Sequence, residues 1–167
     1  LGALLSLFSV GGALWAPGGL SASYRVVAVD ERGAESPVEI PPAPYNELAL
    51  SPDGSRLALV GGPGGTSDLW VADLGRGSIT RLTSGEFVRM PTWTPDGSRI
   101  AYAVVAQGVA EERTRIDWRP ADGSRRAETL VEEGFGRYPT AFTPDGRTLI
   151  YDAAEDARIS TSDLWAL

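Results

Sequence analysis

The sequence of 167 residues contains no cysteine, no histidine and no lysine. The absence of cysteine excludes a disulfide framework, a thiol nucleophile and a cysteine-ligated zinc site. The absence of histidine excludes a Ser-His-Asp triad and any imidazole metal ligand. Without lysine there is no Schiff base, no P-loop lysine and no kinase lysine. Acid–base chemistry would therefore depend on Asp, Glu or Tyr, and metal binding on oxygen ligands, so we expect no catalytic residue, no cofactor and no metal.

The basic residues are few, and all of them are arginine. There are 15 of them against 22 acidic residues, which gives a net charge of -7. Binding to a phosphate backbone needs clustered cations, and Arg125-Arg126 is the only adjacent basic pair. We therefore expect no nucleic-acid partner.

The first 24 residues, up to Tyr24, carry no charged side chain. A transmembrane helix needs about 20 apolar residues, but Gly11-Gly12 and Pro17-Gly18-Gly19 interrupt this run. A signal peptide would have a basic start, which is missing, although Ser21-Ala22-Ser23 resembles a cleavage site. Buried β-structure is the interpretation we favour, with no membrane insertion by this segment. The start at Leu1 and a last strand cut short suggest an excerpt from a longer protein.

A repeat is the strongest signal in the sequence. It occurs at Ser51–Val60, Thr94–Ala103 and Thr143–Asp152, and its aspartates Asp53, Asp96 and Asp145 are 43 and 49 residues apart. A second element follows at Ser67–Trp70, Arg115–Trp118 and Ser162–Trp165. A period of about 40–50 residues with short strands is typical of β-propeller blades.

The Pro-Asp-Gly core of the repeat is typical of a hairpin turn. Proline presets φ for the second turn position, the aspartate bonds nearby backbone, and glycine supplies a left-handed residue. We therefore interpret Asp53, Asp96 and Asp145, with Gly54, Gly97 and Gly146, as structural turn residues. Calcium binding is the weaker alternative, because these carboxylates lie on separate blades and calcium takes six or more oxygens.

The predicted fold is all-β: a β-propeller fragment of about four blades of four antiparallel strands. We divide it into residues 1–43 (a degenerate first blade), 44–87, 88–135 and 136–167 (an incomplete fourth blade). The first blade would contain strands Phe8–Val10, Ala13–Ala16, Tyr24–Val29 and Val38–Ile40. The third would end with Ala127–Val131 and the fourth begin with Thr140–Phe142, joined by a loop over Glu132–Arg137. We expect an open arc, because closure would require Leu1–Leu5 to pair beside Asp163–Leu167.

The repeat Thr-Pro-Asp-Gly-x-x-Ile-Ala-Tyr followed by Ser-Asp-Leu-Trp resembles the WD-like repeat of TolB-type propellers, over about residues 44–167. The segment from Phe8 to Gly33 resembles a subgroup in which the propeller follows a bacterial serine/threonine kinase and a membrane anchor. This resemblance implies a six- to eight-bladed sensor or interaction domain, covalently linked to the rest of its parent, on the periplasmic or extracytoplasmic side; a cytoplasmic location is the alternative. The same repeat also occurs in prolyl-oligopeptidase-like enzymes and in periplasmic TolB.

Long connections predict where a partner would bind. They run over Gly61–Thr66, Ser84–Arg89, Ala106–Thr114, Glu132–Arg137 and Ala153–Thr161, on the face opposite the tight turns. Rigid scaffolds present function on such loops, so we expect a protein or small ligand to bind there. The candidate surface residues are Arg89, Arg137, Tyr45 and Tyr138.

Two interpretations of these side chains stay open. The arginines, each two residues before a proline, would pair with acids such as Glu86 and Glu133, or would recognise an anionic ligand. Trp70, Trp118 and Trp165 would pack between blades, with an aromatic ligand platform as the alternative. The predicted function is a non-catalytic binding segment of a larger bacterial protein; the alternative is the substrate-gating propeller of a peptidase.

Overall fold

The computed structural model describes residues 13–14, 24–62, 67–107, 113–154 and 163–166. The regular secondary structure of this part of the chain consists of β-strands. Within the same residues there is no helix long and apolar enough to cross a membrane. The first sheet contains β1 (Ala13–Leu14), β2 (Val27–Val29) and β3 (Glu35–Pro37) in that order. All pairings are antiparallel.

The second sheet is a four-stranded meander, built on the first copy of the repeat. Its strands are β4 (Tyr45–Leu50), β5 (Arg56–Gly61), β6 (Asp68–Asp73) and β7 (Ser78–Arg81). Both faces of β5 are buried: Leu57 and Leu59 pack toward the first sheet, and Ala58 and Val60 pack toward the third. A strand covered on both faces reads as a continuous apolar run, as Leu57–Val60 does.

The third sheet has six strands rather than four. It contains β8 (Val88–Trp93), β9 (Arg99–Val105), β10 (Arg113–Pro120), β11 (Glu128–Phe142), β12 (Leu149–Ala154) and β13 (Asp163–Ala166), in the order β13-β12-β11-β10-β9-β8. The predicted third and fourth blades are therefore joined by hydrogen bonds into one sheet.

Strand β11 corrects the predicted loop over Glu132–Arg137. The first half of β11 pairs with β10, and its second half pairs with β12. The two strands predicted at Ala127–Val131 and Thr140–Phe142 are therefore parts of one continuous strand, which begins at Glu128. Register shifts lie on both sides of the bend, and Gly136 has φ +52°. A bulge bends a strand, and this allows one strand to pass from one blade into the next.

The first sheet departs from prediction in its last strand. The structure has β3 at Glu35–Pro37 instead of Val38–Ile40, because the chain after Pro37 turns inward: Val38 N–H donates to Val26 O at 3.0 Å and Ile40 is buried. The predicted strand Phe8–Val10 and part of Ala13–Ala16 lie outside the described residues.

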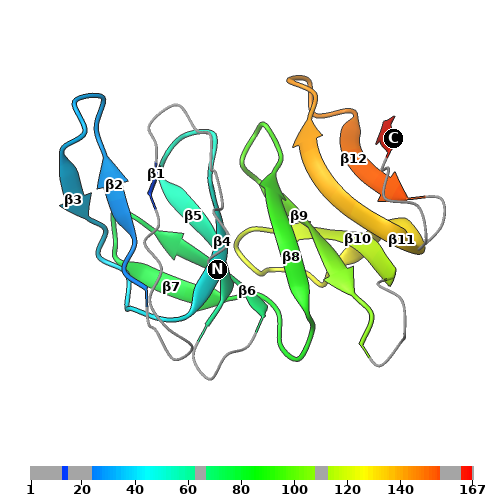
Figure 1. The fold of residues 1–167 in the computed structure, drawn as a ribbon, viewed down its shortest axis with the longest axis horizontal. Helices are drawn as coiled ribbons and strands as arrows, with labels where there is room; N and C mark the ends of the chain where they lie inside the picture. Colours follow the sequence, from blue (N-terminus) through cyan, green and yellow to red (C-terminus); the bar gives the residue numbers. More distant parts are fainter. Residues whose placement is uncertain (1–12, 15–23, 63–66, 108–112, 155–162, 167) are drawn as a thin grey trace, which may run out of the picture.

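The sheets follow one another as an open arc, which confirms the predicted fold class. Figure 1 shows β3 and β13 at opposite ends of the molecule. The first strand of the second sheet, β4, contacts the first strand of the third sheet, β8. Within the third sheet, β8 in turn contacts β11, whose second half opens the predicted fourth blade. Innermost strands around a propeller channel lie next to one another in this way. The alternative pairing of Leu1–Leu5 with the last strand falls outside the described residues.

The hydrophobic core lies between neighbouring sheets and between the two halves of the third sheet. The largest fully buried side chain is Tyr102, in a cluster shared by the second and third sheets. That cluster contains Ala58, Val60, Leu69, Val71, Leu82, Val88, Trp93, Ile100, Tyr102, Val104 and Ala121. Packing between blades therefore fixes the relative position of β4 and β8, on which the candidate site depends.

Candidate functional site

The innermost strands bring together three side chains from separate repeats, Glu47 of β4, Arg89 of β8 and Tyr138 of β11. We refer to them as the inner cluster. Arg89 Nε lies 3.3 Å from Glu47 Oε1, and the Arg89 guanidinium lies over the Tyr138 ring, 5.5 Å from its centroid. The Glu47 side chain is 11% exposed and that of Arg89 38%. The partial burial of Glu47 strengthens this pair relative to a fully solvated one.

Beside the inner cluster, Met90 has a backbone conformation that is rare for a residue with a side chain. Its φ is +52°, at a register shift between Arg89 and Thr92. Its N–H donates to Glu47 Oε2. Bulges re-aim side chains, and strained φ values cluster at binding sites. Met90 (38% exposed) and Phe87 (43%) are the exposed large apolar side chains among the described residues.

Of the four predicted surface residues, Arg89 and Tyr138 come together, whereas Tyr45 and Arg137 do not join them. The predicted surface position of Tyr45 is wrong, because this residue is only 4% exposed and its hydroxyl donates to Pro41 O at 3.1 Å. Burial also raises the pKa of its hydroxyl. Its alternation in β4 places it in the core between the first two sheets, so its ring is not available to a ligand.

Arg137 does not match Arg89 in the sheet. Arg89 pairs with Ala103 of β9, which is six residues after the turn glycine Gly97. The residue six positions after Gly146 is Asp152 of β12, and it pairs with Tyr138 rather than with Arg137. One extra residue between Pro139 and the next turn shifts the register, and a shift by one residue reverses the face. The Arg137 side chain instead lies against Gly134, and its backbone carbonyl accepts from Thr114 Oγ1 at 2.9 Å.

The predicted acidic partners of the two arginines are wrong. Arg89 pairs with Glu47, Glu133 pairs with Arg113 at 2.9 Å, and Glu86 pairs with Arg115 at 3.1 Å. Sequence proximity suggested Glu86 and Glu133, but neighbouring innermost strands bring residues about one repeat apart into contact. That spacing, 42 residues between Glu47 and Arg89, is the signal that could have found Glu47.

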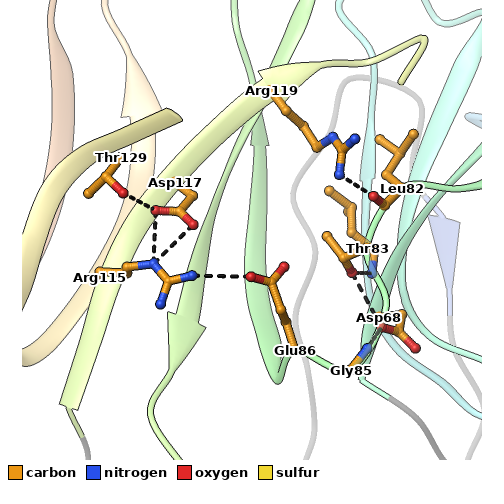
Figure 2. A network of polar contacts seen from close by, with 10 residues as sticks. Asp68, Leu82, Thr83, Gly85, Glu86, Arg115, Asp117, Arg119 and Thr129 are labelled. Carbon is orange, nitrogen blue, oxygen red and sulfur yellow. Dashed lines mark hydrogen bonds and ion pairs between the residues drawn. The ribbon is translucent and has the colours of Figure 1, made fainter. Parts of the chain in front are cut away.

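A second polar network ties β10 to the connection between the second and third sheets (Figure 2). Arg115 Nε lies 3.0 Å from Asp117 Oδ2, and its Nη2 reaches Glu86. Asp117, which is almost fully buried, also accepts from Thr129 Oγ1 at 2.9 Å, and Arg119 donates to Leu82 O. A buried carboxylate that is both paired and hydrogen-bonded is stable in this setting. The network joins blades and offers no open site.

The three Pro-Asp-Gly segments form hairpin turns of the same geometry. Asp96 Oδ1 accepts from Thr94 Oγ1 at 2.6 Å and from Ser98 N–H at 2.9 Å, and these hydrogen bonds lower the pKa of Asp96 to about 2. Asp53 and Asp145 have the corresponding bonds to Ser51 and Thr143, which lower their pKa values as well. The described residues contain no cluster of acidic side chains that could hold a metal.

Trp70 and Trp118 both pack against hydrophobic core clusters, as predicted for packing between blades, but they do not occupy equivalent positions of the repeat. Trp70 pairs with Leu59, the fifth residue after the turn glycine Gly54. Trp165 pairs with Tyr151, the fifth residue after Gly146. At the same position of the third repeat, Tyr102 pairs with Asp117, so Trp118 is displaced by one residue. Trp118 therefore lies on the opposite face of its sheet. There the guanidinium of Arg99 lies over its ring, 4.1 Å from the centroid.

Comparison with known proteins supports the propeller fold. The chain is 36% identical over 88 residues to the Tol-Pal system protein TolB of Thioalkalivibrio sulfidiphilus, which covers 53% of this chain and 19% of the relative. It superposes on the crystal structure of TolB from Acinetobacter baumannii with a TM-score of 0.70 and 20% identity, covering 88% of this chain and 36% of that one.

A peptidase structure shares the same architecture. A structure from a study of two prolyl endopeptidases matches with a TM-score of 0.64 and 18% identity, over 88% of this chain and 25% of that one. No family model matches the sequence. The chain spans about a fifth of the length of the curated relative, and it has a TolB-like β-propeller fold.

Proposed function

We propose that this chain is a non-catalytic binding segment of a larger bacterial protein, and that its partner contacts the inner cluster and the adjoining Phe87 and Met90. The observation that carries the proposal is Met90. A bulge holds its backbone at φ +52° and leaves its side chain exposed, beside Arg89, Glu47 and the Tyr138 ring. Backbone strain of this kind costs about 1–3 kcal/mol, and an exposed surface needs no such strain for folding alone.

The chemistry of this surface favours a protein segment as the partner. Two exposed apolar side chains, Phe87 and Met90, lie within two residues of Arg89, which is paired with Glu47 and lies over the Tyr138 ring. Interfaces concentrate aromatic, Met and Arg side chains in this way. A protein segment that offers an apolar side chain next to a polar group fits the surface better than a small polar anion, because Arg89 is already paired with Glu47.

The parent protein is proposed on resemblance. The TolB-like relatives and the repeat support an interaction role on the extracytoplasmic side of a bacterial membrane, and the segment Phe8–Gly33 favours a membrane-anchored serine/threonine kinase as parent. The likeness to a prolyl endopeptidase supports the gating propeller of a peptidase as the second candidate. A His-Arg-Asp loop upstream in the gene would support the kinase, and a Gly-x-Ser-x-Gly elbow downstream the peptidase.

Site-specific cross-linking in the bacterium would test the binding surface. A photoreactive amino acid replaces Met90 in the full-length parent, and in a matched control it replaces Arg76, whose side chain is 84% exposed in the β6–β7 turn. We expect one discrete cross-linked partner from position 90 and none from position 76, with the product strongly reduced by Arg89→Glu. Equal products from both positions, or none from position 90, would refute the proposed surface.

A further inference from the structure

A pocket of about 450 Å³ lies between two repeat turns, at the end of β8 far from Arg89. The β8–β9 turn and the β11–β12 turn form its two sides, and both lie at the top of Figure 1. Its lining residues are Thr94, Pro95, Asp96, Ser98, Arg99, Trp118, Pro144, Asp145 and Gly146. The function proposed above does not involve this pocket.

The corresponding position between the second and third sheets is filled by an arginine of this same chain. Arg56 crosses from its own turn, and its Nη2 donates to Gly97 O of the next turn at 2.7 Å. Its guanidinium lies over the Trp93 ring, 4.9 Å from the centroid. A Cβ placed on Gly97 would lie 3.2 Å from Arg56 Nη2. The scaffold thus shows how two successive Pro-Asp-Gly turns hold a guanidinium.

Arg99 is the equivalent arginine of the next repeat, but it does not fill the pocket. Its guanidinium lies over Trp118 of its own sheet, and its Nη1 is 3.4 Å from Glu128 Oε2. A Cβ placed on Gly146 would meet only Pro95, at 3.6 Å. At the positions of Trp118 and Glu128, the second sheet has Val71 and Thr80. Val71 has no ring for Arg56 to stack on, and Thr80 has no charge for Arg56 to pair with.

The charge of the pocket favours a cation. Asp96 and Asp145 both line it, and their turn hydrogen bonds lower the pKa of each, so both are ionised at neutral pH. The charge of Arg99 is offset by Glu128. A planar cation can enter between the two turns and donate to a turn carbonyl, as Arg56 does at Gly97 O. The Trp118 ring forms one wall of the pocket, and its face is covered by Arg99.

We propose that this pocket binds the arginine side chain of a partner protein, which takes the place that Arg56 occupies between the preceding sheets. The partner's guanidinium donates to the Gly146 carbonyl and is held by the charge of Asp96 and Asp145. An arginine is favoured over a lysine because its guanidinium is planar, weakly hydrated and presents several donors in a fixed fork, whereas an ammonium is a compact, strongly hydrated charge.

Titration of the ¹⁵N-labelled chain with N-acetyl-arginine amide tests the proposal. We expect saturable shifts of the Gly146 amide and the Trp118 indole resonances. We expect the uncharged citrulline analogue to bind at least about tenfold more weakly, because it cannot form the charge-assisted hydrogen bond. Equal binding of the two compounds, or shifts that do not saturate, would overturn the proposal.

A set of variants separates the pocket from unspecific attraction to acidic groups. Replacing Trp118→Val together with Glu128→Thr recreates the second sheet's pair, so Arg99 should turn to Gly146 and abolish the saturable shift of the Gly146 amide, which is the readout for these variants. Adding Arg99→Met to that variant should restore binding. Unchanged binding in the double variant, or no recovery in the triple variant, would contradict the proposal. Retained shift dispersion in each spectrum shows that the variant is folded.

Discussion

Two turn glycines with the same backbone conformation should differ in their tolerance of alanine. Gly54 has φ +71° and Gly97 has φ +66°. A Cβ at position 54 would meet no atom within 4 Å, whereas one at position 97 would lie 3.2 Å from Arg56 Nη2. Gly54→Ala therefore measures the cost of the conformation alone, and Gly97→Ala adds the cost of moving Arg56.

The magnitudes follow from these contacts. A left-handed non-glycine residue costs about 1–2 kcal/mol, and the loss of chain entropy in the unfolded state returns about 0.4–1 kcal/mol of that. We expect Gly54→Ala to lower the free energy of unfolding by about 1 kcal/mol. Gly97→Ala also weakens the bond from Arg56 to Gly97 O, which at partial exposure contributes about 1 kcal/mol. Its total effect is expected to be about 2 kcal/mol.

Urea unfolding followed by tryptophan fluorescence would measure the difference. With a slope of about 2 kcal/mol per molar urea, the Gly97→Ala midpoint should lie about 0.5 M below that of Gly54→Ala. In an Arg56→Met background the two substitutions should become equally costly, because the contact is gone. Equal midpoints in the natural background, or a difference that persists without Arg56, would refute the role assigned to Arg56.

Three further outcomes are expected. Trp93→Phe should destabilise the fold by about 1 kcal/mol in urea, because the partly buried Ala49 carbonyl loses its indole donor at 2.8 Å. Trp118→Phe, whose indole donates to the exposed Glu128, should cost less than about 0.5 kcal/mol, and equal costs would contradict this. Since the folded pKa of Asp96 is about 2, the contribution of its carboxylate to the free energy of unfolding should be complete above about pH 4 and be lost as the pH falls toward 2. If Asp96→Asn leaves the pH dependence of the free energy of unfolding unchanged in that window, the turn contribution is absent. The chain should show no hydrolase, kinase or transferase activity, and turnover of a glycoside that a single Asp or Glu substitution abolishes would overturn this expectation.

Local chemistry made the hairpins predictable. Proline, aspartate and glycine have conformational preferences that act within four residues, so the three turns and the strands beside them can be read directly from the sequence. The strands β5 and β9 begin where the repeat predicts, at Arg56 and Arg99. The period of the repeat likewise predicted sheets that follow one another in an arc, because each hairpin must bury its apolar faces against its neighbours.

Register and partner choice were decided by the tertiary structure. A single extra residue between Pro139 and Thr143 moves Arg137 out of the position of Arg89, and a shift of one residue turns Trp118 to the other face of its sheet. The strand β11 continues through the predicted loop because two sheets offer it partners in succession. Glu47 meets Arg89 across 42 residues. Local sequence specifies where the chain turns and which strands form, because turns and strands depend on neighbours along the chain. Only the packing of one blade against the next decided which charges pair, which aromatic rings are buried and where a pocket stays open, because those depend on residues a whole repeat apart.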